Sequence, residues 1–238
     1  FLLSAEVQSG TAFVARAKMP FAVIPPPTAE MAAPEFRRSP FGLCGAGIGS
    51  PALTGPLKEF RKFIGGRWHF TGAMAWRGVE KQPGVWNFGE VASQIRDDYV
   101  RVMPYITQTP EWAQKAPKSY YPRDWTGVTE YATRAASFYR EHVKPPRVYL
   151  LGNEWCGIEA TKGDIQDEIT YNRLAAQAIR AADPEATILL YGPEGDIHSG
   201  RSRKLYESGV FDLCDGFHIH YYINSAVPET GSPVYGER

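Results

Sequence analysis

The sequence lacks the features that mark several common classes of protein. Its cysteines, Cys44, Cys156 and Cys214, are too few and too scattered for a disulfide framework or a CxxC metal site. The formal charges of its 26 basic and 26 acidic side chains cancel, so the net charge gives no reason to expect a nucleic acid or an anionic membrane as a partner. No apolar run reaches the length of a transmembrane helix. What remains is an ordinary globular composition, and 238 residues suffice for one large α/β domain.

The beginning of the chain carries neither of two common start signals. Phe1 stands where a methionine would begin a gene product, and residues 1–30 lack the charged region, apolar stretch and cleavage site of a secretory signal. We therefore expect upstream and downstream parts of the same parent chain, and the residues themselves leave the localisation unknown.

The chain divides into three parts. Residues 1–24 alternate as two strands around Gln8-Ser9-Gly10, which predicts a β-hairpin at the end of an upstream β-rich segment. Residues 25–38 are rich in proline and predict a linker. Over residues 39–238, short apolar segments alternate with amphipathic helical ones, as in repeated βα units that build a parallel sheet.

These units predict a TIM (β/α)8 barrel that is truncated at its C-terminus after about six βα units, since a complete barrel takes about 250 residues. The alternative is a doubly wound nucleotide-binding sheet. However, the glycines of 45–49 follow a GxGxG spacing rather than GxGxxG, and Ser50-Pro51 interrupt any immediate helix. Helices are expected near 128–142 and 165–182, the second capped by Asp164. Strands are expected near 41–45, 68–74, 99–106, 147–153, 186–191 and 214–220.

A glutamate at the end of a buried strand indicates catalysis. Gly152-Asn153-Glu154-Trp155 closes the apolar run 148–151, where an ionised carboxylate has no stabilising role. Partial burial raises the pKa of a carboxylic acid, which makes it a proton donor near neutral pH. The amide of Asn153 can both donate and accept hydrogen bonds, and the ring of Trp155 can stack on a sugar.

Four motifs then occur in order, and together they resemble one group of enzymes. They are Trp76-Arg77-Gly78-Val79-Glu80 with Pro83-Gly84-Val85-Trp86-Asn87-Phe88, then the segment from Tyr105 to Ala113 with its Pro110-Glu111-Trp112-Ala113 exit, then Asn153-Glu154, and last His220-Tyr221-Tyr222 after Asp215. This series is similar to the strand exits of retaining glycoside hydrolases with a (β/α)8 barrel. That clan contains cellulases, xylanases, β-xylosidases and α-L-iduronidases.

The resemblance implies a hydrolysis of O-glycosidic bonds with no cofactor and no metal. Glu154 would be the general acid and base, and Asn153 would bind the sugar 2-hydroxyl. It also favours a carbohydrate substrate and a secreted or extracytoplasmic protein. Thr71 departs from the arginine that the clan commonly carries there, and the nucleophile is expected beyond Arg238. The substrate cleft is expected to contain Trp76, Trp112, Asn153, Trp155, His220 and Tyr222.

Two other functions remain open from the residues. His218 and His220 point to one face of their strand, which would suit a metal-dependent hydrolase on the same barrel. The third possibility is a non-catalytic carbohydrate-binding barrel, in which the aromatic side chains bind sugar without a complete pair of carboxylates.

Overall fold

The structure is a computed structural model that describes residues 2–9, 12–20, 68–95, 101–153, 164–192 and 200–218. The first two segments form the predicted hairpin, in which β1 (Leu2–Ser9) pairs antiparallel with β2 (Ala12–Pro20). β1 runs through Gln8 and Ser9, which the sequence analysis assigns to the turn, and the register shifts between Val7 and Gln8. The assignment of the hairpin to an upstream segment stays a prediction, and the linker lies outside the described residues.

Five parallel strands form one sheet in the order in which they occur along the chain, β3-β4-β5-β6-β7. Each corresponds to a predicted strand, while the strand expected near 41–45 lies outside the described residues. The strands are β3 (Trp68–Thr71), β4 (Arg101–Ile106), β5 (Arg147–Leu151), β6 (Ala186–Tyr191) and β7 (Gly216–His218).

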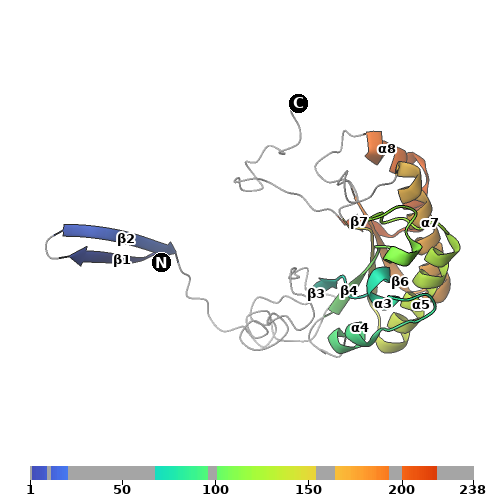
Figure 1. The fold of residues 1–238 in the computed structure, drawn as a ribbon, viewed down its shortest axis with the longest axis horizontal. Helices are drawn as coiled ribbons and strands as arrows, with labels where there is room; N and C mark the ends of the chain where they lie inside the picture. Colours follow the sequence, from blue (N-terminus) through green and yellow to red (C-terminus); the bar gives the residue numbers. More distant parts are fainter. Residues whose placement is uncertain are drawn as a thin grey trace.

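The helices lie on one side of this sheet (Figure 1). Sequential strand order with helices on a single side is the winding of a (β/α)8 barrel, whereas a doubly wound sheet reverses its strand order and carries helices on both faces. The predicted barrel architecture is therefore confirmed over the described strands. The helices are α3 (Trp76–Val79), α4 (Gly89–Gln94), α5 (Thr126–His142), α7 (Ile165–Ala182) and α8 (Gly200–Glu207), with 3-10 turns η3 (Glu111–Ala113) and η4 (Val210–Leu213).

The sheet is strongly curved. Tyr105 of β4 and His218 of β7 have ring centroids 5.9 Å apart, although β5 and β6 separate their strands. In a flat sheet, three strand spacings would keep such side chains about 14 Å apart. The contact between these rings therefore requires the curl of a barrel wall, and Tyr105 packs on its inner face with Val148 and Leu150.

Buried tyrosines join the outer helices to the sheet and its loops. The hydroxyl of Tyr131 on α5 donates to the carbonyl of Met74 at 2.7 Å, and the hydroxyl of Tyr139 donates to the carbonyl of Val102. Burial raises the pKa of both hydroxyls, so they remain protonated donors. These two bonds fix the rotation of α5 against β4 and the segment after β3.

The second long helix begins as the sequence predicts. The Asp164 carboxylate accepts from the Asp167 backbone N–H at 2.9 Å, and the Asp167 carboxylate accepts from the Asp164 N–H at 3.0 Å. This reciprocal capping box satisfies two N–H groups that a helix start would otherwise leave without partners. α7 then packs along α5 and presents Ala175, Ala178 and Ile179 to the core.

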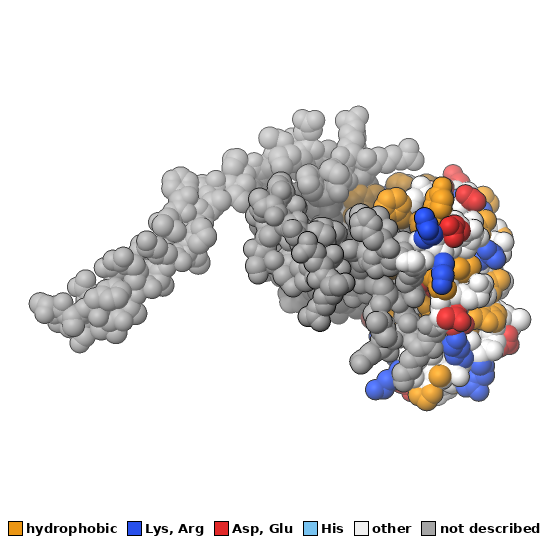
Figure 2. Space-filling model, turned by 90° about the horizontal axis from the view of Figure 1, so that it is seen from above, with side chains coloured by type: hydrophobic (Ala, Val, Ile, Leu, Met, Phe, Trp, Pro, Cys, Tyr) orange, Lys and Arg blue, Asp and Glu red, His pale blue; other side chains and the backbone are white. Residues whose placement is uncertain are grey.

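The surface mixes charges of both signs. Figure 2 shows lysine and arginine side chains interspersed with acidic ones over the described part of the visible face. Within the described ranges no helix combines the length and the apolar character that crossing a membrane requires. Cys214 is a free, half-buried thiol whose pKa is raised to about 12 by burial, and the other two cysteines lie outside the described residues.

Candidate active site

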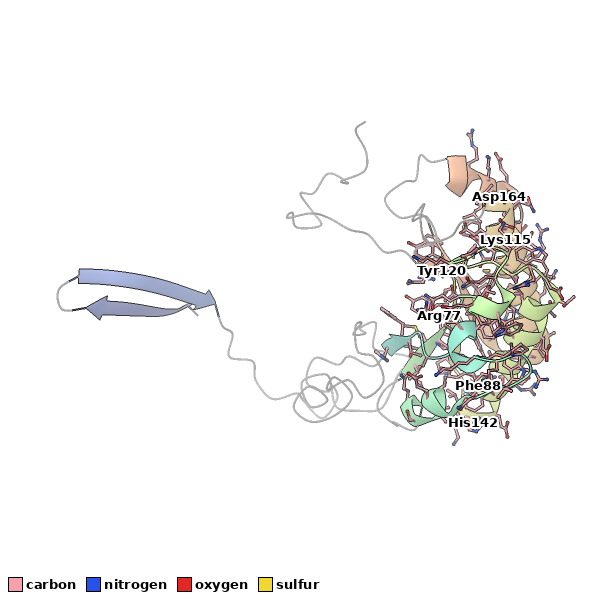
Figure 3. The ribbon with its side chains drawn as sticks, in the orientation of Figure 1. Arg77, Phe88, Lys115, Tyr120, His142 and Asp164 are labelled. Carbon is pink, nitrogen blue, oxygen red and sulfur yellow. The ribbon has the colours of Figure 1, made fainter. Side chains whose placement is uncertain are left out.

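The carboxyl ends of the strands identify one edge of the sheet. In Figure 3, Lys115, Tyr120 and Asp164 lie toward one end of the molecule, while Phe88 and His142 lie toward the other. Asp164 begins α7 and His142 ends α5. Because the helices of βα units run opposite to the strands, the end with Asp164 is the carboxyl edge, where barrel enzymes place their catalytic groups.

Asn153 lies at this edge, two residues after the end of the fully buried strand β5. Gly152 adopts a φ of 78°, which favours glycine, and its N–H donates to the carbonyl of Ile106 at 3.3 Å. The chain thus turns away from the sheet while it stays attached to the end of β4. Asn153 is half-buried, and the predicted acid Glu154 and its neighbour Trp155 lie outside the described residues.

His218 ends β7 and packs among aromatic rings. Its ring lies 5.2 Å from that of Tyr191 on β6 and 5.9 Å from that of Tyr105. Over the ranges that the structure describes, no three His, Cys, Asp or Glu side chains gather as a metal site would require. His220, the other member of the suggested metal pair, and Tyr222 lie outside those ranges.

Trp76 lies in the core, which differs from the cleft position that the sequence analysis expects. It is 1% exposed, and its ring stacks on Tyr131 with centroids 5.4 Å apart. The physical reason is Gly127 of α5, because a Cβ there would lie 2.6 Å from the indole. The missing side chain leaves room for the ring to turn inward, so no face of Trp76 is open to a sugar.

The indole of Trp76 fixes a buried carboxylate. Its Nε1 donates to Glu80 Oε2 at 2.6 Å, and the other carboxylate oxygen accepts from the Gly84 N–H at 2.7 Å. The Trp112 Nε1 donates to the Glu80 carbonyl at 3.1 Å. Glu80 is 4% exposed, so these donors replace the water that a carboxylate needs. Trp76 and Glu80 therefore hold the loops after β3 and β4 together. Trp112 is half-buried, so part of its side chain stays at the surface.

The same two loops enclose a cavity of about 750 Å³. Backbone bonds join them, because Trp76 N donates to Thr107 O at 3.0 Å and Arg77 N donates to Gln108 O at 2.9 Å. The cavity thus lies beside the strand ends and is built from neighbouring βα units. Its lining is Arg77, Thr109, Glu111, Gln114, Lys115, Ala116, Pro117, Lys118, Tyr120 and Arg123.

The long loop that forms most of the cavity is braced internally. Gln114 Nε2 donates to the Thr109 carbonyl at 3.1 Å, and Gln114 Oε1 accepts from the Lys118 N–H at 2.8 Å. The Thr109 hydroxyl donates to the Tyr120 carbonyl at 2.6 Å. These bonds cross the loop from both sides and give the cavity wall a defined shape.

Arg77 is recognisable from the sequence as a strand-end residue, whereas Lys115, Lys118 and Arg123 are not among the predicted site residues. A signal was present, since residues 107–125 join β4 to α5 and far exceed the roughly 2–6 residues usual for such a connection. Long βα loops at the carboxyl edge are where barrels build their sites. Three basic side chains on one such loop indicate a binding role.

Solved structures similar to this chain include several glycoside hydrolases. A family 39 glycoside hydrolase from the gut symbiont Bacteroides cellulosilyticus WH2 covers 100% of this chain and 48% of its own, at 16% identity and a TM-score of 0.66. The GH53 catalytic domain of Ignisphaera aggregans covers 85% of this chain and 63% of its own, at 15% identity and 0.57. A GH39 β-xylosidase from Caulobacter crescentus covers 76% and 52%, at 14% identity and 0.53.

No protein-family model matches the sequence, and no curated protein matches it. The chain spans about half the length of the first of these structures. Likeness at such low identity establishes the fold, so the chain has the fold of the (β/α)8-barrel glycoside hydrolases. The resemblance that the four motifs predict is confirmed at this level.

Proposed function

We propose that the chain is part of a glycoside hydrolase that cleaves O-glycosidic bonds with retention of configuration, with Glu154 as general acid and base. The observation that carries this proposal is the half-buried Asn153 at the carboxyl edge, two residues after the end of buried β5. The next residue in the sequence is Glu154, and catalytic residues of barrels follow strand ends at this edge. The similar structures, all glycoside hydrolases by description, support the reaction class.

In the proposed mechanism, Glu154 protonates the glycosidic oxygen while a second carboxylate attacks the anomeric carbon. Water then hydrolyses the covalent glycosyl-enzyme, and Glu154 takes a proton from that water. Asn153 hydrogen-bonds the 2-hydroxyl, which strengthens in the transition state. The two carboxyl groups must stand about 5–5.5 Å apart, and we expect the second beyond Arg238.

The substrate of this mechanism is an oligosaccharide or polysaccharide. Trp112 supports this class because it is half-buried and lies in η3, near the beginning of the loop that forms most of the cavity. Trp155, His220 and Tyr222 complete the proposed cleft together with Asn153. Trp76 contributes from the core rather than from the cleft. Its indole holds the Glu80 carboxylate, and the Glu80 carbonyl accepts from Trp112, which fixes the position of Trp112.

The test replaces Glu154 by glutamine in the complete protein and measures hydrolysis of aryl glycosides across pH. We expect kcat/KM for poor leaving groups to fall about 10²–10⁴-fold, because these depend most on protonation. The basic limb of the pH profile should disappear, and azide should restore turnover. Glu141→Gln, at an exposed position near the end of α5, is the matched control and should retain full activity.

Three other outcomes would redirect the proposal. Retained activity of Glu154→Gln on poor leaving groups would show that the acid lies elsewhere. Inhibition by a chelator with recovery on zinc addition would favour the metal-dependent hydrolase that uses His218 and His220. Absence of activity in every form, together with sugar binding in a titration, would favour the non-catalytic barrel.

A further inference from the structure

The cavity at the carboxyl edge has a basic lining. Among the described residues, its walls carry Arg77, Lys115, Lys118 and Arg123 against one carboxylate, that of Glu111. The chain as a whole has no formal net charge, so the excess of positive charge is local to this cavity. A concave surface lined by one sign of charge concentrates ligands of the opposite sign.

Two of these cations keep their side-chain donors available. Arg77 and Lys118 are exposed, and the bonds that they make to described residues use their backbone N–H groups, which donate to Gln108 and Gln114. A guanidinium offers five N–H donors and an ammonium offers three. Within the described part of the chain, these donors face the cavity without an acidic partner.

The other two cations are held in position by the protein. Lys115 forms an ion pair with Asp167 of α7 and lies 5.8 Å from the ring centroid of Tyr121. Arg123 Nη2 donates to the Trp112 carbonyl at 2.6 Å, which occupies one of its five donors. Arg123 therefore adds positive potential to a fixed part of the wall, whereas the charge of Lys115 is balanced by Asp167. Figure 3 shows Lys115 and Tyr120 toward the carboxyl edge, with Arg77 farther from it.

Among the described lining residues, basic donors outnumber the acceptors that a neutral sugar would need. Neutral sugars present hydroxyl groups that donate as well as accept, and they need carboxylates or amides to receive their protons. The Gln114 amide is used within the loop at both ends, and the Thr109 hydroxyl donates its proton to the Tyr120 carbonyl, so the Thr109 oxygen and the Glu111 carboxylate are the acceptors that remain among the described lining residues. Donors thus dominate the cavity, with the half-buried Tyr120 as an apolar wall beside them.

We propose that this cavity binds an acidic group carried by a saccharide, either a carboxylate or a sulfate, with Arg77 and Lys118 as its principal contacts. The planar fork of a guanidinium matches two oxygens of either group, and a nearby ammonium adds a compact charge. That the ligand is a saccharide rests on the proposed function, whereas its acidity rests on the lining of the cavity alone.

The test compares three matched probes with the complete protein: methyl glucuronide, methyl glucoside 6-sulfate and neutral methyl glucoside. Ligand-observed NMR titration gives each Kd without requiring turnover. We expect the charged sugars to bind about tenfold more tightly than the neutral one, a difference that one hydrogen bond to a charged group supplies. Preference for only one charged probe identifies which acidic group the cavity takes, and added salt should weaken only the charged probes.

A double variant assigns the binding to the cavity. Arg77→Gln with Lys118→Gln should raise the Kd of the charged sugars about tenfold and leave that of methyl glucoside unchanged. Lys144→Gln with Lys204→Gln removes the same charge at exposed positions outside the cavity lining, so it should change neither. Circular dichroism of both variants verifies folding.

Two results would overturn the inference: equal affinity of the wild-type protein for all three probes, or charged-sugar affinity that survives the cavity variant. Neither result bears on Glu154, because the binding readout needs no hydrolysis. Conversely, loss of the proposed function in the aryl glycoside assay would leave the preference for acidic sugars measurable by titration.

Discussion

Arg147 and Asp183 form a buried bidentate ion pair at the end of the molecule opposite the candidate site. Arg147 Nε and Nη2 donate to the two carboxylate oxygens of Asp183 at 2.6 and 2.5 Å, and the Tyr149 hydroxyl donates to the same carboxylate at 3.0 Å. Arg147 begins β5, and Asp183 follows α7. The pair therefore joins the amino end of a central strand to the end of the helix that covers it.

Removing the carboxylate should destabilise the protein strongly. Asp183→Asn removes the buried carboxylate that pairs with Arg147, whose side chain is 4% exposed, and leaves the guanidinium with Glu185, which is 72% exposed, as its charged partner. Breaking a buried pair from one side costs about 3–5 kcal/mol, which urea unfolding would measure. Glu185→Gln is the control, because Glu185 lies 3.3 Å from the same guanidinium but is 72% exposed, and it should cost less than about 1 kcal/mol. Equal losses in the two variants would contradict this assignment.

The same pair predicts how stability depends on pH. Burial pushes the pKa of the Asp183 carboxyl upward, but the hydrogen bonds and charge of Arg147 and the bond from Tyr149 hold it below its ordinary value. A pKa lower in the folded state stabilises the protein above about pH 4, the unfolded value, and this contribution is lost as the pH falls through the folded pKa. Unfolding free energies measured from pH 7 down to pH 3 should fall more steeply in the wild-type protein than in Asp183→Asn.

The long periodic patterns of the sequence predicted their elements well. α7 begins at the predicted cap Asp164 because the capping box is local, and every residue that forms it lies within one helical turn. The order of the strands was predictable because a parallel sheet of repeated βα units leaves few ways to connect. Asn153 was predictable as an edge residue, since a glycine after five buried residues ends the strand.

The position of Trp76 could not be predicted from its neighbours. The residues next to a tryptophan at a strand exit do not indicate whether its ring faces a cleft or the core. Here the choice depends on Gly127, far along the chain, whose missing side chain accommodates the ring. The basic cavity was hidden for the same reason, because Arg77 reaches it from one loop and Lys118 from another.

Gly127 supplies a prediction about this packing. An alanine Cβ at this position would lie 2.6 and 2.9 Å from two atoms of the Trp76 ring, which is buried and held by its bond to Glu80. We expect Gly127→Ala to destabilise the protein by about 1–2 kcal/mol, since overpacking outweighs the gain in helix propensity. Gly200→Ala, with no atom of the described residues within 4 Å of the added Cβ, should be neutral or stabilising. Thermal unfolding distinguishes the two, and a more stable Gly127→Ala would refute the tight contact.

Glu80 gives the last prediction, which separates support of the site from catalysis. Glu80→Gln turns one acceptor into an NH₂ group that must face either the Trp76 indole N–H or the Gly84 N–H, because each carboxylate oxygen now accepts one of them. A buried donor without an acceptor costs about 1–3 kcal/mol, so unfolding should occur at lower urea concentration. The loosened loop should also raise KM for the proposed glycoside substrate, since Trp112 is fixed through the Glu80 carbonyl. The basic limb of the pH profile should remain, because Glu154 is intact. Its disappearance in Glu80→Gln would instead assign the proton donor to Glu80.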